Sequence, residues 1–357
     1  MSQVPHFDPL RFPRLITLFA CLVCLVIANL AVGSEPSNQN AIENREPVIR
    51  VGMIGLDTSH CLAFTKLLND DNAPPELANC RVICAYPKGS PDIESSTSRV
   101  PGYTEEMKKL GVEIVPSIAA LIEQVDCVLL ETNDGRPHLE QVKPVIEAGK
   151  SVFIDKPLAG SLADCLAIYA LAEEHQVPVF SSSSLRFSAG VQAVRSGAAG
   201  DVLGCEAYSP CALEATHPDL FWYGIHGVEL LYTAMGPGCV SVTRSSTPGT
   251  DVAVGTWSDG RIGTFRGIRN GKSGYGGTVF GSKAIQPLGG YDGYRPLVVE
   301  IVKFFRTGES PIPAEETLEL YAFMEAADES KRQEGRPVAI ADVMSRAKKE
   351  VGLSDDN

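Results

Sequence analysis

A glycine turn early in the chain has a spacing that suits phosphate binding. It follows the buried-strand pattern of residues 48–54, and Gly55 stands where the first glycine of a G-x-G-x-x-G turn belongs. Asp57 takes the place of the second glycine, and His60 takes the place of the third. A carboxylate at the second place would face a phosphate at ~4 Å, which costs roughly 4 kcal/mol at an effective dielectric constant of about 20. The turn therefore predicts an altered nucleotide site.

The same turn has a second, structural interpretation. Asp57, Thr58 or Ser59 can cap the helix that follows, and a carboxylate there complements the helix dipole. In the first interpretation, a nucleotide still binds if Asp57 turns away and the side chains of Thr58, Ser59 or His60 reach its phosphates. Both interpretations stand on the sequence alone.

The strand that follows the turn lacks the acid that usually binds the ribose hydroxyls of a dinucleotide. It ends in Ala85-Tyr86-Pro87-Lys88, and Asp92 comes several residues later. The charge of Lys88 suits a 2′-phosphate, which favours NADP over NAD if either of them binds.

A lysine and a histidine, far apart in the sequence, are candidates for proton chemistry. Lys156 follows an apolar strand pattern and precedes Pro157, and His226 lies in an apolar helix pattern with Glu229 one turn later. Hydride removal from an alcohol requires loss of the hydroxyl proton, and therefore a base whose pKa is near the working pH. Lys156, His226 and Glu229 are the residues expected to be catalytic through the family resemblance given below. His226 and Glu229 also have metal-ligand spacing, but no third ligand is evident, and we expect no metal.

Each of these candidates has a structural alternative. Lys156 can be a solvated lysine after a strand. His226 can be a core histidine packed among Phe221, Trp222 and Leu230. His138 can cap a helix rather than contact a ligand.

The first half of the chain alternates strand and helix patterns. This alternation is typical of right-handed crossovers and of a doubly wound parallel sheet. The expected strands are 48–54, 81–86, 114–115, 125–131 and 151–154. The expected helices are 62–68, 104–110, 117–124 and 139–148.

The second half has a different pattern, in which short strands follow one another between Gly, Pro and Asp turns. We expect an open, mainly antiparallel sheet in an α+β domain. Its expected strands are 202–209, 240–247, 251–256, 262–268 and 277–281, and its expected helices are 190–196, 225–235, 294–306 and 314–333. The domains are placed at 47–165 (Rossmann-like, dinucleotide-binding) and 166–350 (substrate and oligomerisation).

The amino-terminal segment and the composition bear on location and partners. Arg11 and Arg14 precede the apolar run 15–31, which predicts a signal peptide over 1–33 and a polar tether over 34–46. An uncleaved membrane anchor is the alternative. We expect an exported protein, periplasmic or extracellular. The net charge of −13 argues against nucleic-acid binding.

Eight cysteines remain beyond the expected signal peptide, and none forms a Cys-x-x-Cys pair. Several lie in apolar runs, so we expect most to be buried free thiols, with Cys205 and Cys211 as the one pair to consider for a disulfide. The eight are Cys61, Cys80, Cys84, Cys127, Cys165, Cys205, Cys211 and Cys239.

Five segments together resemble the glucose-fructose oxidoreductase / inositol dehydrogenase family, Gfo/Idh/MocA, over about residues 48–347. They occur in the family's order: 125–132 with His138; Glu147-Ala148-Gly149-Lys150 with Asp155-Lys156-Pro157; Arg186-Phe187; 224–229; and 334–338. The family has Glu-Lys-Pro where this chain has Asp-Lys-Pro. It commonly has an Asp four residues before the histidine, where this chain has Trp222.

The resemblance implies hydride transfer between NAD or NADP and a sugar or polyol, with Lys156 at the reacting oxygen and His226 carrying the proton. It also implies homo-oligomerisation through the second-domain sheet. The implied cofactor-binding residues are Gly55, Asp57, Thr58, Ser59, His60, Thr132, Asn133, His138, Lys156, Pro157 and Arg186.

Two other functions fit the same sequence. One is a glycosidase or lyase assisted by a retained cofactor, and the other is a carbohydrate-binding protein that has lost the cofactor. Export favours a tightly held cofactor or none, because soluble nicotinamide cofactor is scarce outside the cytoplasm.

Overall fold

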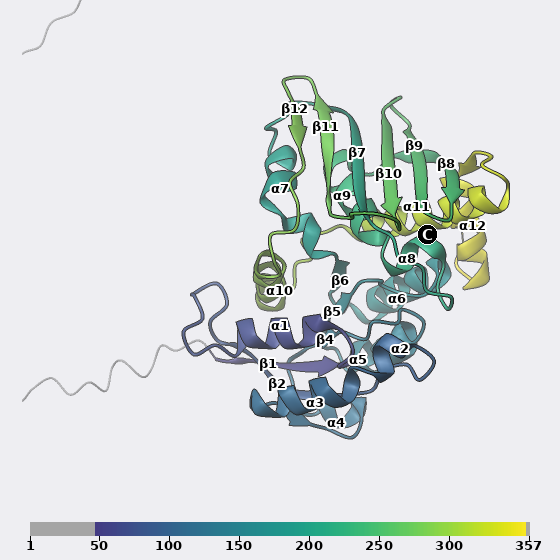
Figure 1. Cartoon of the computed structure of the whole chain (residues 1–357). Coiled ribbons are helices and arrows are strands. Elements are labelled where there is room, and N and C mark those ends of the chain that lie inside the picture. The colour runs from purple at the N-terminus through teal and green to yellow at the C-terminus, as the bar shows by residue number, and fades with distance from the viewer. Residues whose placement is uncertain (1–46, 355–357) are drawn as a thin grey trace, which may run out of the picture. The chain divides into compact units, whose positions relative to one another are not determined.

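The computed structural model describes residues 47–354, which contain two β-sheets and the helices that cover them (Figure 1). The expected signal peptide and tether, residues 1–46, lie outside the described residues. None of the helices within residues 47–354 combines the length and apolar character that a bilayer span requires.

The first sheet is parallel, with the strand order β3-β2-β1-β4-β5-β6 of a doubly wound dinucleotide-binding fold. This confirms the predicted fold class for the first domain. Its strands are β1 (Ile49–Ile54), β2 (Cys80–Tyr86), β3 (Glu113–Ile114), β4 (Cys127–Leu130), β5 (Ser151–Asp155) and β6 (Val179–Ser182). Its helices are α1 (Ser59–Leu68), α2 (Glu94–Thr97), α3 (Val100–Lys109), α4 (Ile118–Ile122), α5 (His138–Glu147) and α6 (Leu162–His175).

The first sheet extends beyond the domain boundary expected at residue 165. That residue lies inside α6, and β6 still pairs with β5 in parallel. The crossover through α6 is needed to bring β6 to the edge of the sheet, so the first domain continues at least to Ser182.

The second sheet has seven strands in the order β12-β11-β7-β10-β9-β8-β13. All neighbours are antiparallel except β7 and β10, which are parallel. The expected mainly antiparallel sheet is therefore confirmed. Its strands are β7 (Val202–Pro210), β8 (Cys239–Thr247), β9 (Thr250–Trp257), β10 (Ile262–Ile268), β11 (Gly276–Gly281), β12 (Ile285–Pro287) and β13 (Val338–Ala339).

Helices cover one face of this second sheet, and α9 and α11 lie directly on its strands. The 3-10 helix η2 (Ser184–Phe187) and α7 (Ala189–Arg195) connect it to the first domain. The other helices are α8 (Asp219–Trp222), α9 (Ile225–Met235), α10 (Arg295–Thr307), α11 (Ala314–Arg332) and α12 (Ile340–Glu350).

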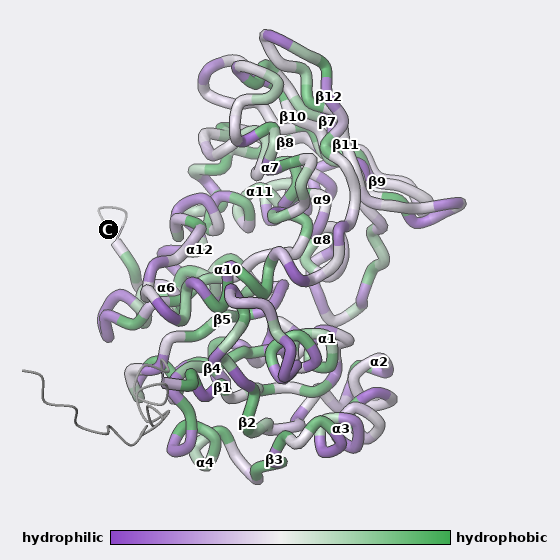
Figure 2. Tube along the Cα trace, turned by 90° about the vertical axis from the view of Figure 1, so that its left-hand side faces the viewer, coloured by the Kyte–Doolittle hydropathy of each residue, from purple (hydrophilic) through white to green (hydrophobic). Residues whose placement is uncertain are grey.

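Two apolar clusters hold the elements together. The larger one runs from the α4–α5 side of the first sheet into the covered face of the second sheet. The smaller one lies between the first sheet, α1 and α10. In Figure 2 the hydrophobic colour follows strands β2 and β5 and part of α10. Helix α10 therefore returns from the end of the second sheet to complete the first domain, next to α1 (Figure 1).

All eight described cysteines are buried free thiols, as the sequence predicted for most of them. Cys205 and Cys211 are not joined by a disulfide. Burial raises the pKa of the Cys205 thiol to about 12, and Cys211 shows the same shift. These thiols act as small core side chains.

Candidate active site

A cavity of about 280 Å³ lies at the carboxyl edge of the first sheet, where the second domain meets it. In an open α/β sheet this edge is where ligands bind. First-domain residues on the cavity wall are Thr58, Ser59, His60, Ser95, Arg99, Asn133 and Lys156. The remaining wall residues are Ser184, Leu185, Trp222, Tyr223, His226, Tyr275, Tyr291 and Tyr294.

Lys156 and His226 both line this cavity, although they come from different domains. Lys156 directly follows β5, and its Nζ lies 5.4 Å from the centre of the Tyr223 ring. His226 is in the first turn of α9, and its Nδ1 lies 2.8 Å from Ser183 Oγ. Burial, reinforced by the nearby charge of Lys156, lowers the pKa of His226 well below its usual value. The imidazole is therefore neutral at pH 7 and able to accept a proton.

The amino end of α1 forms one wall of the cavity. Thr58 is the N-cap of α1, because its Oγ1 accepts the His60 backbone N–H at 3.0 Å. Of the three capping residues that the sequence offered, Thr58 is the one that caps. Thr58 and Ser59 line the cavity, and Arg99 adds a positive charge beside them. Hydroxyls, a helix amino end and a guanidinium together suit an anionic group.

The carboxylate of Asp57 does not have the role expected from its place in the turn. It is fully buried, with Oδ2 accepting the Ser96 hydroxyl at 2.7 Å and Oδ1 accepting the Asn133 backbone N–H at 2.9 Å. Burial raises the pKa of Asp57 to about 6, while these hydrogen bonds oppose the rise. Because the side chain links α2 to the β4–α5 loop, it is absent from the cavity wall. The expectation that the Asp57 carboxylate faces a bound phosphate and repels it is therefore wrong.

Gly55 and Thr132 form the tight contact beneath this loop rather than the cavity wall. Gly55 has a φ of +89°, and a Cβ there would lie 2.5 Å from the Thr132 backbone nitrogen. Only glycine accommodates both constraints. The Thr132 hydroxyl donates to Gln141 Oε1 at 3.0 Å. Asn133 does line the cavity, whereas Pro157 does not.

Glu229 is not a partner of His226, contrary to expectation. Its carboxylate is buried, pairs with Arg186 and accepts the Ser182 hydroxyl at 3.1 Å. Arg186 also pairs with Glu316, at 2.5 Å. Arg186 and Glu229 are absent from the cavity wall, so both act as a buried ion-pair network between domains rather than at a ligand.

His138 is structural as well. It is fully buried, with Nδ1 3.1 Å from the Leu158 carbonyl oxygen and Nε2 2.8 Å from the Thr132 carbonyl oxygen. Burial lowers its pKa, although the two carbonyls oppose that shift. His138 therefore ties the loops after β4 and β5 together, beneath the cavity, and the expectation that it contacts the cofactor is wrong.

Four tyrosines of the second half were missed from the sequence. Tyr223, Tyr275, Tyr291 and Tyr294 line the cavity, and Tyr223 and Tyr275 have their rings 5.7 Å from that of His226. They come from different segments and share no spacing that would have marked them. The one signal they have in common is a neighbouring glycine, one residue before or after each tyrosine.

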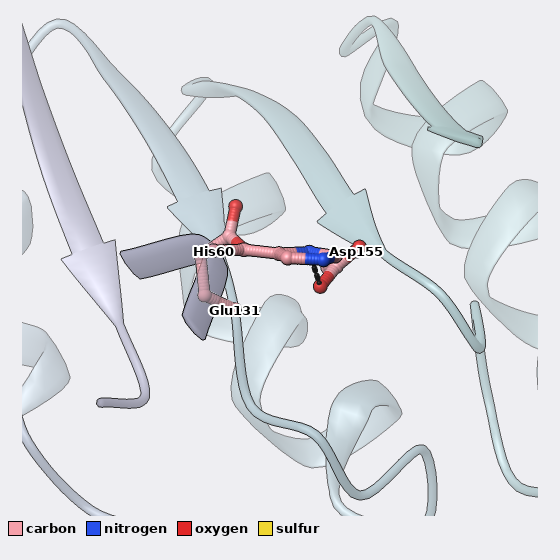
Figure 3. Close-up of side chains that lie close together, drawn as sticks. All are labelled: His60, Glu131 and Asp155. Carbon is pink, nitrogen blue, oxygen red and sulfur yellow. Dashed lines mark hydrogen bonds and ion pairs between the residues drawn. The ribbon is translucent and has the colours of Figure 1, made fainter. Parts of the chain in front are cut away.

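His60 links the cavity to two buried carboxylates. Its Nδ1 lies 2.6 Å from Asp155 Oδ2 and 4.0 Å from Glu131 Oε2 (Figure 3). Asp155 and Glu131 are fully buried at the ends of β5 and β4. Burial alone would raise the pKa of Asp155, but the charge and hydrogen bond of His60 hold it below its usual value. Burial and the neighbouring Asp155 raise the pKa of Glu131.

A family model confirms the resemblance drawn from the sequence motifs. Residues 49–183 match the Gfo/Idh/MocA model, described as an oxidoreductase family with an NAD-binding Rossmann fold. The first domain of the chain therefore matches this family. The Gfo/Idh/MocA match covers all six strands of the first sheet, including β6.

Two curated proteins are similar over part of the chain. An uncharacterised oxidoreductase of Streptococcus pneumoniae is 28% identical over 157 residues, which is 42% of this chain and 42% of that protein. The 2,7-anhydro-N-acetylneuraminate hydratase of Escherichia coli is 33% identical over 136 residues, 36% of this chain and 32% of the hydratase. The chain thus matches less than half of the length of either relative.

Among solved structures, scyllo-inositol dehydrogenase from Lactobacillus casei, with bound NAD(H) and scyllo-inositol, has the same fold. The TM-score is 0.66 at 16% identity, and the alignment covers 82% of this chain and 99% of that one. The coverage shows that the similarity of fold extends beyond the first domain into the second.

Proposed function

We propose that this protein is an NAD(P)-dependent oxidoreductase that acts on a sugar or polyol. The observation that carries the proposal is the meeting of Lys156 and neutral His226 in one cavity between the two domains. The cavity is lined by four tyrosines beside Lys156 and His226, and tyrosine rings can pack against a small ring. The inositol bound by the Lactobacillus casei relative is such a ring.

The residues at the amino end of α1 fit the phosphate-bearing part of the cofactor. Thr58, Ser59 and Arg99 would hold the pyrophosphate, and Asn133 and Lys156 would lie toward the nicotinamide. Asp57 leaves this place free of a carboxylate because it is turned into the loop. When bound, the nicotinamide supplies hydride acceptance and donation.

The preference between the two nucleotides rests on the end of β2. Lys88 is exposed there, and Asp92, the next acid along the chain, is paired with Arg136 at 2.8 Å. The exposed charge of Lys88 suits a 2′-phosphate better than a ribose 2′-hydroxyl. We therefore propose a preference for NADP over NAD.

Residues of the chain itself can remove the proton of the substrate hydroxyl. When the Nδ1 proton of His226 is donated to Ser183 Oγ, Nε2 carries a lone pair that can accept the substrate hydroxyl proton. The Lys156 ammonium would polarise the same oxygen and stabilise its developing negative charge. The four tyrosines would pack against the C–H faces of the ring and bind its other hydroxyls.

The test is oxidation of a panel of inositols and hexoses with NAD or NADP, comparing wild type with Lys156→Ala and His226→Asn. Loss of the general base should lower kcat by roughly 10²–10⁴-fold. His175→Asn, at the exposed end of α6, is the matched control and should retain wild-type activity. Activity that survives in His226→Asn would refute this role of His226.

A hydratase or lyase with a retained cofactor is the second candidate, and it is favoured by the similarity to the Escherichia coli hydratase. The two candidates differ in the cofactor balance. An oxidoreductase converts added NADP to NADPH in step with product, whereas a hydratase forms product without net change in the cofactor. Cofactor that remains with the purified protein after gel filtration would support the second candidate. A binding protein without cofactor would show neither reaction, only ligand binding.

We also propose that the protein is exported, on the basis of the apolar run 15–31 that follows Arg11 and Arg14. Fusion of residues 1–35 to a periplasmic reporter tests this. Retention of the reporter in the cytoplasm would contradict the proposal.

A further inference from the structure

Three side chains of the types that ligate metals converge at the carboxyl edge of the first sheet. His60 comes from the first turn of α1, Glu131 directly follows β4, and Asp155 ends β5. The donor atoms of all three lie within 4.8 Å of one another (Figure 3). The side chains of the two acids point to the same side of the sheet as Leu129 and Phe153, which face α1.

Glu131 makes this cluster unusual. It is fully buried, and no donor in residues 47–354 hydrogen-bonds to either of its carboxylate oxygens. The oxygens of Asp155, in contrast, accept from His60 at 2.6 Å and from the Lys156 backbone N–H at 2.8 Å. A buried carboxylate without a partner is strongly unfavourable, so Glu131 requires either a cation or a proton.

We propose that His60, Glu131 and Asp155 bind one divalent metal ion, with Zn²⁺ as the best match. One imidazole and two carboxylates supply the nitrogen and oxygen ligands that zinc accepts, and the two negative charges balance the ion. In a tetrahedral zinc site the nitrogen and oxygen ligands lie about 3.3 Å apart. The present distances of 2.6 and 4.0 Å from His60 Nδ1 fall on either side of that value, so small side-chain rotations are sufficient.

The site would have an open position on the side of the cavity. Glu131 and Asp155 are fully buried, whereas His60 lines the cavity, so the ion enters and exchanges ligands past His60. Three protein ligands and one open position are the arrangement of zinc sites that bind an exogenous oxygen. The backbone N–H of Lys156 holds Asp155 in place, as an outer partner of a metal ligand does.

The alternative is a proton shared between the two acids. A protonated Glu131 would donate to Asp155, and no ion would be needed. Glutamine has the shape of a protonated glutamic acid, so the two explanations predict opposite results for Glu131→Gln. If the two acids share a proton, the Glu131→Gln variant should be as stable as wild type and should have the same metal affinity. Under the metal site, it removes an anionic ligand.

The experiment measures zinc binding directly and needs no enzymatic activity. The purified protein, first treated with chelator and dialysed, is titrated with Zn²⁺, Mn²⁺ and Mg²⁺ by calorimetry, and its melting temperature is measured with and without Zn²⁺. Wild type should bind one Zn²⁺ and melt at a higher temperature with it. Glu131→Gln and His60→Asn should lower the zinc affinity by more than about 100-fold, because loss of a residue that only supports a ligand already costs roughly 10–100-fold.

Glu113→Gln is the matched control, since it removes an exposed carboxylate from β3 of the same sheet. This control should bind Zn²⁺ as wild type does. The proposal is overturned if wild type binds no Zn²⁺, or if Glu131→Gln binds it with wild-type affinity. Because the readout is metal content and stability, failure here leaves the proposed oxidoreductase activity to its own test.

Discussion

His226 is buried beside a lysine, and this determines the pH range in which it can act as a base. Its pKa is lowered well below 6.5, so protonation begins only in more acidic solution. We expect kcat for alcohol oxidation to be constant from about pH 8 down to 6.5 and to fall below that. A pH–rate profile checks this. A fall centred at or above 6.5 would mean that another group supplies the base.

Asp57 offers a prediction about stability rather than activity. Its pKa is 3.8 when unfolded and about 6 when folded, mainly because it is buried. The folded state binds this proton more tightly, so the stabilisation is complete below pH 3.8 and is lost as the pH rises through 6. The side chain introduced by Asp57→Asn does not titrate. The unfolding free energy of this variant, relative to that of wild type, should therefore increase between pH 4 and 7. The increase should reach roughly 3 kcal/mol for a pKa difference of about two units.

The measurement is chemical unfolding of both proteins at several pH values, because only the difference between them isolates Asp57. In Asp57→Asn the amide oxygen of the new side chain can still accept the Asn133 backbone N–H, so that contact is retained. A difference in unfolding free energy that does not change with pH would contradict the prediction.

The catalytic candidates differ in how far the sequence could reveal them. Lys156 and His226 stand in motifs whose order marks them, and the cavity contains both. Glu229 has suitable spacing but pairs with Arg186, which comes from another segment, and spacing within one helix cannot reveal such a partner. Glu131 looked like the end of an apolar strand. Only the lateral pairing of β4 and β5 shows that it adjoins Asp155.

At the scale of elements, α9 places His226 through a close contact with the second sheet. A Cβ on Gly227 would lie 2.3 Å from the Phe265 ring and 2.9 Å from Ser209 Oγ. Gly227→Ala should push α9 away from β7 and β10, lower the free energy of unfolding by roughly 1–3 kcal/mol and reduce the activity.

Gly102 is the matched control for this change. It lies in α3, and no atom lies within 4 Å of where its Cβ would be. Gly102→Ala should increase the free energy of unfolding by up to about 1 kcal/mol, from helix propensity alone. Thermal unfolding and initial rates of both variants test the contrast. Equal effects of the two substitutions would argue against the packing explanation.

Regular elements with a strong period were predicted well, and short ones were not. Strand β10 matches its expected bounds, 262–268, and α9 matches 225–235, because apolar residues recur there with the period of the element. Helix α2 has only four residues and no period. It is nevertheless the element that binds the Asp57 carboxylate and keeps it out of the cavity. The contact that decides whether the glycine turn can accept a phosphate was therefore the least predictable.

At the scale of the molecule, the outer face of the second sheet is open and partly apolar. Tyr208, Ile262 and Phe280 are exposed on neighbouring strands, and the register places them on one face. We expect this face to form the interface of a homo-oligomer. Ile262→Asp should shift the oligomer toward monomer in light scattering after gel filtration. Leu213→Asp, an exposed apolar residue after β7, is the control.

Helix α10 belongs to the first domain in space but comes late in the chain. Its residues Leu297, Ile301 and Phe304 pack in the cluster with Val51 and Phe64. A growing polypeptide cannot close this cluster until Phe304 has left the ribosome, when most of the chain has been synthesised. A gene fragment encoding only residues 49–183 would therefore keep α1 but lack α10, which leaves part of the apolar cluster exposed, and aggregation is the expected fate of such a fragment.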